Sequence, residues 1–496
     1  MASKPTNHLH ILMIPLLAPG HTIPMINMAT LFAKQPNITV TIVTTPVNAI
    51  RYGPNLQSHI NAGLPVRFLQ LPFPSIENGL PDGCESADLV PGLHLLPNFS
   101  AAVDMLQQRL EQRFDSIKPR PNCVVSDKFM LWTDDTARKY RIPRIVFDGM
   151  SCFKQLVTYY LYAHKVFDEL GELEPFVLPG LPDRIEITRA QLPPEFNYTR
   201  MATSEQLERV RETEARAYGM VVNSFEELEQ EYVKEFKKLK EGKVWCIGPL
   251  SLSSEKDLGE TLRGDGIDDE QRYLKWLDSK ERGSVVYACF GSSSRVTPPQ
   301  LIELGLALEA SKSPFIWVIR AGDRVEEVEN WLSESGFENR IKDRGMVIRD
   351  WAPQVLILSH PSVGGFLTHC GWNSILEGVS AGVPMITWPQ FAEQFLNEKL
   401  IVQVVGIGVS VGAPVVVHWG EEDKFGVTVK SEQVKTAIER VMDMGSEGNE
   451  RRKKAKALGM VAKKALEEGG SSHNNLTLLI QDLLQLSDVA SQKSST

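Results

Sequence analysis

Short apolar runs alternate with longer segments of helical period in the first part of the chain. The run Ile38–Val43 is β-branched throughout, which is typical of a buried strand. We expect strands at 9–17, 38–43, 66–71, 123–125 and 144–147, and helices at 23–33, 107–117 and 133–140. Strand–helix–strand alternation of this kind predicts an α/β fold whose parallel sheet has helices on both faces.

The alternation stops at residues 251–271, which are polar and acidic and show no apolar period. We expect a linker there. Behind it the pattern restarts, with strands expected at 284–290, 315–320, 346–348 and 383–387 and a helix at 300–310. Two α/β halves of similar length predict a ligand cleft between them.

The last apolar pattern, residues 474–486, predicts a helix that packs back on the first half. Residues 487–496 are expected to form a disordered tail. The predicted organisation is therefore a first domain at 1–250, a linker at 251–271, a second domain at 272–473, the returning helix and the tail.

Composition narrows the classes of function. The 496 residues are 42% hydrophobic and 23% charged, which excludes a disordered or fibrous chain. A formal charge of −9 argues against nucleic acid or an anionic membrane surface as the main partner. No apolar stretch reaches the length of a membrane-spanning helix. These features favour small-molecule chemistry.

The cysteines and the N-terminus indicate the compartment. Six scattered cysteines form no C-x-x-C pair, so neither a zinc site nor a disulfide scaffold is suggested. The apolar run after Lys4 resembles a signal peptide, but His8 and His10 interrupt it and Pro15 breaks it. We expect a cytoplasmic monomer.

Two polar residues follow strands in the first half. His21 stands between the first strand and the next helix, and Asp127 ends the strand at 123–125. Both therefore belong to the carboxyl edge of one sheet, where open α/β folds hold their ligands. A carboxylate there is able to fix the tautomer of a histidine base and stabilise its protonated form. The alternatives are a capping or core histidine and an aspartate that caps the following helix.

The second half concentrates polar residues after its strands. A small-residue loop at 290–294 has backbone N–H groups suited to phosphate. The segment 369–374 reads HCGWNS and opens a helix, so His369, Asn373 and Ser374 are candidates for diphosphate oxygens. Glu377 shares a helix face with Asn373 and is a candidate for a ribose hydroxyl.

Three further residues complete this region. Trp351 offers a flat platform for a base, and Glu393 and Gln394 offer groups for sugar hydroxyls. Each also has a plainer interpretation: Trp351 as core, Glu377 as a solvated helix face, and Gln394 as a loop cap. Their concentration between Trp351 and Gln394 favours a nucleotide-sugar site.

This block of 44 residues resembles the C-terminal signature of plant family 1 UDP-glycosyltransferases. The resemblance covers nearly the whole chain and is strongest to the subgroup acting on cytokinins, brassinosteroids, flavonols and triterpenoid sapogenins. Further matching segments are 126–127, 147–150, 222–226, 247–249, 276–278, 419–422 and 467–472.

The resemblance implies the GT-B fold, in which two Rossmann-like domains face a cleft. It implies that His21 is the catalytic base and Asp127 its supporting carboxylate. The residues implied to bind the UDP-sugar are Ser292, Trp351, Ala352, Gln354, His369, Trp372, Asn373, Ser374, Glu377, Glu393 and Gln394. The closing Gln394 is usual for glucose donors in this family.

The resulting hypothesis is an inverting transfer of glucose from UDP-glucose to a hydroxyl or carboxyl of a hydrophobic plant metabolite, with a triterpenoid or steroid sapogenin as first choice. Flavonoid or cytokinin acceptors, or another UDP-sugar, are the alternatives. The absence of any Asp-x-Asp motif favours a site without metal or cofactor. Rival activities are a nucleotide-sugar epimerase, a phosphorylase, and a non-catalytic nucleotide-sugar-binding protein.

Overall fold

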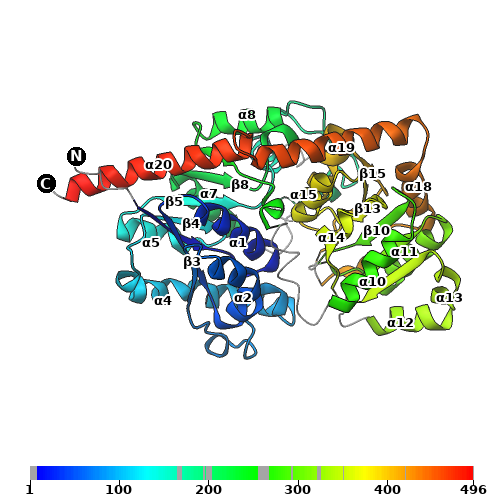
Figure 1. The fold of residues 1–496 in the computed structure, drawn as a ribbon, viewed down its shortest axis with the longest axis horizontal. Helices are drawn as coiled ribbons and strands as arrows, with labels where there is room; N and C mark the ends of the chain where they lie inside the picture. Colours follow the sequence, from blue (N-terminus) through cyan, green and yellow to red (C-terminus); the bar gives the residue numbers. More distant parts are fainter. Residues whose placement is uncertain are drawn as a thin grey trace. The chain divides into compact units, whose positions relative to one another are not determined.

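The chain folds into two compact units (Figure 1). Unit 1 consists of residues 1–152, 202–262 and 465–496, and unit 2 of residues 153–201 and 263–464. Each unit contains one large parallel sheet, which confirms the α/β class. The computed structural model describes residues 8–164, 170–193, 196, 204–254, 267–291, 294–320, 325–349, 351–418 and 420–494.

The sheet of unit 1 has seven parallel strands in the order β3-β2-β1-β4-β5-β8-β9. In β1, Leu9, Ile11 and Met13 face one core, whereas Leu12 and Ile14 face the other. Because both faces are covered, the strands read as nearly continuous apolar runs. The strands are β1 (Leu9–Ile14), β2 (Ile38–Thr44), β3 (Val66–Gln70), β4 (Cys123–Asp127), β5 (Arg144–Asp148), β8 (Gly219–Val222) and β9 (Val244–Cys246).

Helices cover both faces of this sheet. Side chains of α1 pack in the same core as Leu476, Leu479 and Leu483 of the C-terminal helix α20, and α3 and α4 pack in the core on the other face. The helices of unit 1 are α1 (Pro19–Ala33), α2 (Pro46–Asn61), α3 (Leu96–Asp104), α4 (Leu106–Arg113), α5 (Trp132–Tyr140), α7 (Ser204–Arg216), α8 (Gln230–Leu239) and α20 (Ser471–Ser494).

The sheet of unit 2 has six parallel strands in the order β12-β11-β10-β13-β14-β15. They are β10 (Val285–Cys289), β11 (Phe315–Ile319), β12 (Gly345–Arg349), β13 (Val363–Thr368), β14 (Met385–Thr387) and β15 (Gly408–Ser410). The helices are α10 (Ile267–Asp278), α11 (Pro298–Ala310), α12 (Val325–Glu334), α13 (Phe337–Ile341), α14 (Gln354–Leu358), α15 (Trp372–Ala381), α16 (Gln394–Lys399), α17 (Glu422–Phe425), α18 (Ser431–Met442) and α19 (Ser446–Leu466).

The division of the chain differs from the expected one. Residues 153–201, which we assigned to the first domain, cluster with unit 2. This segment holds helix α6 (Cys152–His164) from its second residue on, and a small antiparallel pair, β6 (Pro175–Val177) and β7 (Glu186–Thr188). Its backbone is tied to the second unit because Val416 N donates to Ala190 O at 2.9 Å.

The prediction of a disordered C-terminal tail was wrong for most of residues 487–496. Helix α20 begins at Ser471 and continues to Ser494, so residues 487–494 extend the helix instead of forming a tail. Within the expected linker, residues 255–266 lie outside the described part of the chain. No helix in the described ranges has the length and apolar character that crossing a membrane requires.

Candidate active site

The first site forms where the strand order of unit 1 reverses, between β1 and β4. The two strands pair directly, with Ile14 opposite Ser126, so residues that follow them meet at one sheet edge. Helix α1 begins at Pro19, earlier than predicted, and His21 lies in its first turn. The N-cap residue is Ala18, which makes no side-chain cap. His21 is therefore not a capping residue.

His21 and Asp127 form a hydrogen-bonded pair. Nδ1 of His21 lies 2.7 Å from Oδ2 of Asp127. The carboxylate is 1% exposed and the imidazole 21% exposed. Because the carboxylate only accepts, Nδ1 carries the proton and Nε2 becomes the basic nitrogen. The sequence brought both residues to one edge, and the structure brings them into contact.

The second carboxylate oxygen of Asp127 is also fixed. Its Oδ1 accepts a hydrogen bond from Phe129 N at 3.0 Å. Helix α5 begins only at Trp132, with Leu131 at its N-cap, so Asp127 does not cap that helix. Both carboxylate oxygens instead hold the histidine and its own turn.

The sequence interpretation missed Phe129. Its ring stands edge-on to His21, with centroids 6.1 Å apart and planes at 68°, and 44% of the residue is exposed. The neighbouring Lys128 is held by Asp148, whose Oδ2 lies 2.7 Å from Nζ. The available signal was a large apolar residue directly after the Ser-Asp pair, in a loop at the ligand edge.

The second site forms where the strand order of unit 2 reverses, between β10 and β13. Cys289 pairs with Thr368, so Gly291 and His369 follow neighbouring strand ends. A Cβ on Gly291 would lie 2.5 Å from Cε1 of His369, and one on Gly371 would lie 2.4 Å from Nε2. Gly291 also has a φ of +70°. Both glycines are required by the close approach of the imidazole.

His369 differs from His21 in its surroundings. The residue is 8% exposed, and burial lowers its pKa from 6.5 to about 4. Among the described residues its Nδ1 has no hydrogen-bond partner. A neutral imidazole with an unpaired buried nitrogen is suited to a hydrogen bond with a ligand.

Helix α15 begins beside His369. Gly371 is its N-cap, and Trp372, Asn373 and Ser374 form its first turn. The N–H groups of a first helical turn and the helix dipole favour an anion at this end. Trp372 is only 3% exposed, so its indole belongs to the core and does not offer its ring to a ligand.

Gln354 links the groups expected to hold the nucleoside. Its Nε2 donates to Glu377 Oε2 at 2.5 Å and to Ser374 Oγ at 3.1 Å. Its Oε1 accepts from the hydroxyl of the buried Tyr287 at 3.3 Å, a partner that the sequence interpretation missed. The expected uracil and ribose ligands on α14 and α15 are thus joined in one network.

Trp351 lies three residues before Gln354 in the chain. It is 62% exposed, so it is not a core tryptophan and its ring offers a free face. The buried Ala352 accepts a hydrogen bond from Gln354 N through its carbonyl at 2.8 Å, which fixes the turn between Trp351 and Gln354. The plainer interpretation of Trp351 as core is excluded.

The two residues expected to bind sugar behave differently. Gln394 is 3% exposed, and its Oε1 accepts from the N–H groups of Gln390 and Phe391 at 2.9 and 3.2 Å. Its carbonyl therefore caps the loop, and only its amide nitrogen is left for a ligand. Glu393 is more exposed and accepts from Asn397 Nδ2 at 3.4 Å.

Asn397 was not identified from the sequence. Its Nδ2 also donates to Cys370 O at 2.9 Å, so it connects the turn after β13 to the loop that carries Glu393. It is fully buried. Ser292, the remaining expected diphosphate ligand, lies outside the described residues.

Two family models match most of the chain. The model for "UDP-glucoronosyl and UDP-glucosyl transferase" matches residues 268–446. The model for "Glycosyltransferase, N-terminal domain" matches residues 7–252. The chain is 48% identical to UDP-glycosyltransferase 73C6 of Arabidopsis thaliana, over 96% of this chain and 97% of that one. It is also 48% identical to UDP-glycosyltransferase 73C25 of Barbarea vulgaris, over 97% and 98%.

Solved structures show the same fold. UGT73P12 of Glycyrrhiza uralensis, complexed with glycyrrhetinic acid 3-O-monoglucuronide, aligns with a TM-score of 0.90 at 37% identity, over 98% of each chain. UGT71G1 of Medicago truncatula, complexed with UDP-glucose, aligns with a TM-score of 0.76 at 25% identity, over 96% of this chain and 98% of that one.

Proposed function

The chain belongs to the plant family 1 UDP-glycosyltransferases, of GT-B fold, and from that premise we propose that it transfers glucose from UDP-glucose, with inversion, to a hydroxyl of a hydrophobic small molecule. The observation that carries the chemical part is the 2.7 Å hydrogen bond between His21 and Asp127 at the switch point of the first sheet.

His21 acts as the base in this proposal. Its Nε2 takes the proton of the acceptor hydroxyl while the oxygen forms a bond to the anomeric carbon and the bond from that carbon to UDP breaks. Asp127, almost fully buried, stabilises the imidazolium that results. The leaving UDP carries away the electron pair, and the attack from the opposite side inverts the configuration.

The donor side is assigned to unit 2. The first turn of α15 and the neutral His369 receive the diphosphate. Gln354 and Glu377 receive the nucleoside, and Trp351 stacks on the uracil ring. Glu393 and the amide nitrogen of Gln394 bind sugar hydroxyls. UDP-glucose is a co-substrate, and the mechanism asks for no metal or cofactor.

We favour a triterpenoid or steroid sapogenin as the acceptor. Support comes from the similarity to UGT73P12, whose structure contains a triterpenoid glucuronide, and from the exposed ring of Phe129 beside His21. Leu80, Phe153 and Phe196 are buried, so we do not count these apolar side chains among the acceptor contacts. Flavonoids and cytokinins remain outcomes of the test.

We further propose that the enzyme works in the cytoplasm as a monomer. All six cysteines are free thiols, including Cys152 and Cys246, whose sulfurs lie 3.7 Å apart without a bond. Unbridged thiols at this distance support a reducing compartment.

The test is a product assay with a matrix of donors and acceptors. UDP-glucose, UDP-glucuronate and UDP-xylose are each offered with triterpenoid, steroid, flavonol and cytokinin acceptors, and products are identified by mass. We expect a hexose adduct on a triterpenoid or steroid. A pentose or glucuronate adduct would refute the glucose donor. UDP-glucose consumed without any acceptor would indicate an epimerase or hydrolase, and unchanged donor throughout would favour a binding protein.

A further inference from the structure

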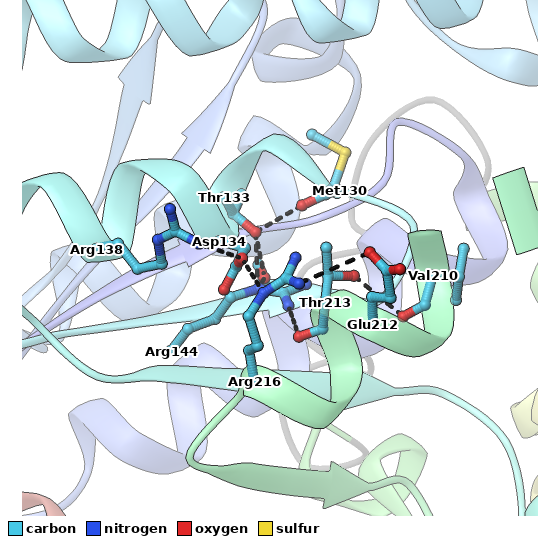
Figure 2. A network of polar contacts seen from close by, with 10 residues as sticks. Met130, Thr133, Asp134, Arg138, Arg144, Val210, Glu212, Thr213 and Arg216 are labelled. Carbon is cyan, nitrogen blue, oxygen red and sulfur yellow. Dashed lines mark hydrogen bonds and ion pairs between the residues drawn. The ribbon is translucent and has the colours of Figure 1, made fainter. Parts of the chain in front are cut away.

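A buried arginine lies behind the His21–Asp127 pair. Arg144 is the first residue of β5 and is 3% exposed. Figure 2 shows its guanidinium reaching toward Thr133 of α5 and Thr213 of α7. Burying an arginine costs several kcal/mol unless its charge and hydrogen bonds are compensated. An apolar residue at the start of a buried strand would avoid this free-energy cost. We therefore looked for the role of the buried charge in its hydrogen-bond partners.

The guanidinium forms hydrogen bonds with two hydroxyl groups next to the His21–Asp127 pair. Its Nε lies 2.9 Å from Ser126 Oγ and 2.9 Å from Thr133 Oγ1. The two hydroxyls lie 2.8 Å from each other. Nη1 donates to Thr213 O at 3.0 Å, which anchors the arginine to α7.

These hydroxyls stand at the two ends of the turn that carries Asp127. Ser126 directly precedes Asp127 in β4, and Thr133 Oγ1 donates to Met130 O at 2.5 Å. The turn itself closes through Met130 N, which donates to Asp127 O at 3.1 Å. Arg144 therefore reaches both sides of the turn through one shared nitrogen.

The charge of Arg144 also acts on Asp127. Burial lowers the pKa of Arg144 from 12.5 to about 10, so the group is still charged at neutral pH. Attraction to Asp134 and to Asp127 opposes that lowering. Asp134 is shared, since Arg216 Nε lies 2.8 Å from its Oδ2 and Arg138 Nη1 lies 3.9 Å away (Figure 2). The buried positive charge therefore attracts the carboxylate that supports His21.

We propose that Arg144 is a positioning residue for glycosyl transfer, which holds the turn of Asp127 and thereby keeps its carboxylate in place against His21. This role rests on the proposed function of the His21–Asp127 pair. It predicts that loss of the arginine lowers turnover without weakening the donor site, which is built from other residues.

The first experiment compares Arg144→Lys with Arg138→Met. Lysine keeps the charge but has no fork of donors, so the bonds to Ser126, Thr133 and Thr213 cannot all be made. We expect kcat to fall about ten- to a hundredfold, as a misplacement of about 1 Å in a catalytic group does. KM for UDP-glucose should stay within about twofold, because turnover and donor binding depend on different groups. Arg138→Met, at the exposed end of the same network, should leave both constants unchanged.

The second experiment is a double-mutant cycle with Asp127→Asn. If Arg144 acts through Asp127, adding Arg144→Lys to Asp127→Asn should lower kcat by less than about threefold further. The same fractional loss in both backgrounds would overturn the proposal, because the arginine would then act independently of the carboxylate. A rise in the KM of Arg144→Lys for UDP-glucose as large as its fall in kcat would overturn the proposal as well.

Thermal unfolding checks that each variant is folded, and a third variant provides an independent test. If the Arg144 variants do not fold, Ser126→Ala is used instead. It removes the hydrogen bond between Arg144 Nε and Ser126 Oγ while the guanidinium charge stays buried. We then expect a loss in kcat of about three- to tenfold, consistent with the net contribution of one ordinary hydrogen bond, because Thr133 keeps its own bond to the guanidinium. Wild-type kcat in folded Ser126→Ala would overturn the positioning role.

The outcomes separate the two proposals. If His21→Ala and Asp127→Asn keep wild-type turnover, the proposed function of the pair fails whatever Arg144 does. If those variants lose turnover while Arg144→Lys keeps it, only the role of Arg144 fails.

Discussion

Each sheet places a histidine at its switch point, after β1 in unit 1 and after β13 in unit 2, and the two histidines have opposite surroundings. His21 follows β1 at the switch point of unit 1, is 21% exposed, and has a buried carboxylate 2.7 Å from Nδ1. His369 follows β13 at the switch point of unit 2, is 8% exposed, and has no partner for Nδ1 among the described residues. The topology of the sheet thus determines where each histidine lies, and the presence or absence of a carboxylate beside Nδ1 determines its chemistry.

The difference concerns the proton. In the proposed mechanism the base gains charge, so it needs a compensating group in a region of low dielectric, and we assign that role to Asp127. Burial without such a group lowers the pKa of His369 to about 4, which keeps it neutral. In the proposed reaction His21 becomes charged, whereas burial by itself keeps His369 neutral.

The strongest way to break this contrast is to remove the charge of Asp127. Asp127→Asn keeps the size of the side chain but no longer stabilises an imidazolium, so kcat should fall about a thousandfold, within the usual contribution of a supported base. Turnover is measured by UDP release with saturating acceptor. The affinity for UDP, measured by calorimetry, should not change. A kcat within twofold of wild type would contradict the role of the carboxylate.

The opposite change removes the neutral histidine. His369→Gln loses a buried hydrogen bond to a charged diphosphate, which is worth about 1.5–3 kcal/mol, so the Kd for UDP should rise about ten- to a hundredfold. Calorimetry with UDP checks this result. His21→Ala is the matched control and should bind UDP as the wild type does. Equal effects of both variants on UDP affinity would erase the distinction.

The glycines beside His369 give a smaller effect. Gly371→Ala puts a Cβ 2.4 Å from Nε2 of His369, so the imidazole must move. We expect UDP affinity to fall about tenfold, consistent with a weakened hydrogen bond to a charged group. Gly53→Ala is the control, because a Cβ at Gly53 meets nothing within 4 Å. Unchanged affinity in Gly371→Ala would show that the histidine is not held in contact with the ligand.

The smallest effect is on stability against pH. The folded state holds the pKa of His369 at about 4, whereas the unfolded chain returns it to 6.5. As the pH falls, the unfolded chain takes up the proton first, so this contribution is complete above pH 6.5 and is lost down to about pH 4. In His369→Gln, the loss in free energy of unfolding between pH 7 and 5 should be about 1–2 kcal/mol smaller.

Urea unfolding at the two pH values measures this difference. His10 is the internal reference, because burial also lowers its pKa to about 4 and both variants retain it. The same pH dependence in wild type and His369→Gln would contradict the neutral state of His369.

The sequence predicted the sheets well for a physical reason. Parallel strands buried on both faces are apolar runs, and β1, β2, β10 and β11 stood out as such. Strand β13 was missed because its sequence VGGFLT contains two glycines. The assignment of 153–201 failed because chain order says nothing about which sheet a loop packs on.

The candidate sites were predicted residue by residue, but their contacts were not. His21 and Asp127 were recognised as residues of one sheet edge, yet their contact depends on β4 pairing with β1, which is a long-range arrangement. Arg144 read only as the start of a strand, because nothing local indicates a buried charge. The sequence predicted Gln394 as a sugar ligand but could not show that its side-chain carbonyl accepts a hydrogen bond from Gln390 N, which depends on how the loop folds.

The most direct test of the central claim uses His21→Ala and two acceptors with one aglycone skeleton. One carries an aliphatic alcohol, and the other carries a phenol acidic enough to be ionised in the assay. A missing base should lower transfer to the alcohol by about a thousandfold and transfer to the phenolate by less than about tenfold, because the phenolate has no proton to give. An equal fall for both acceptors, or no fall for either, would contradict His21 as the base.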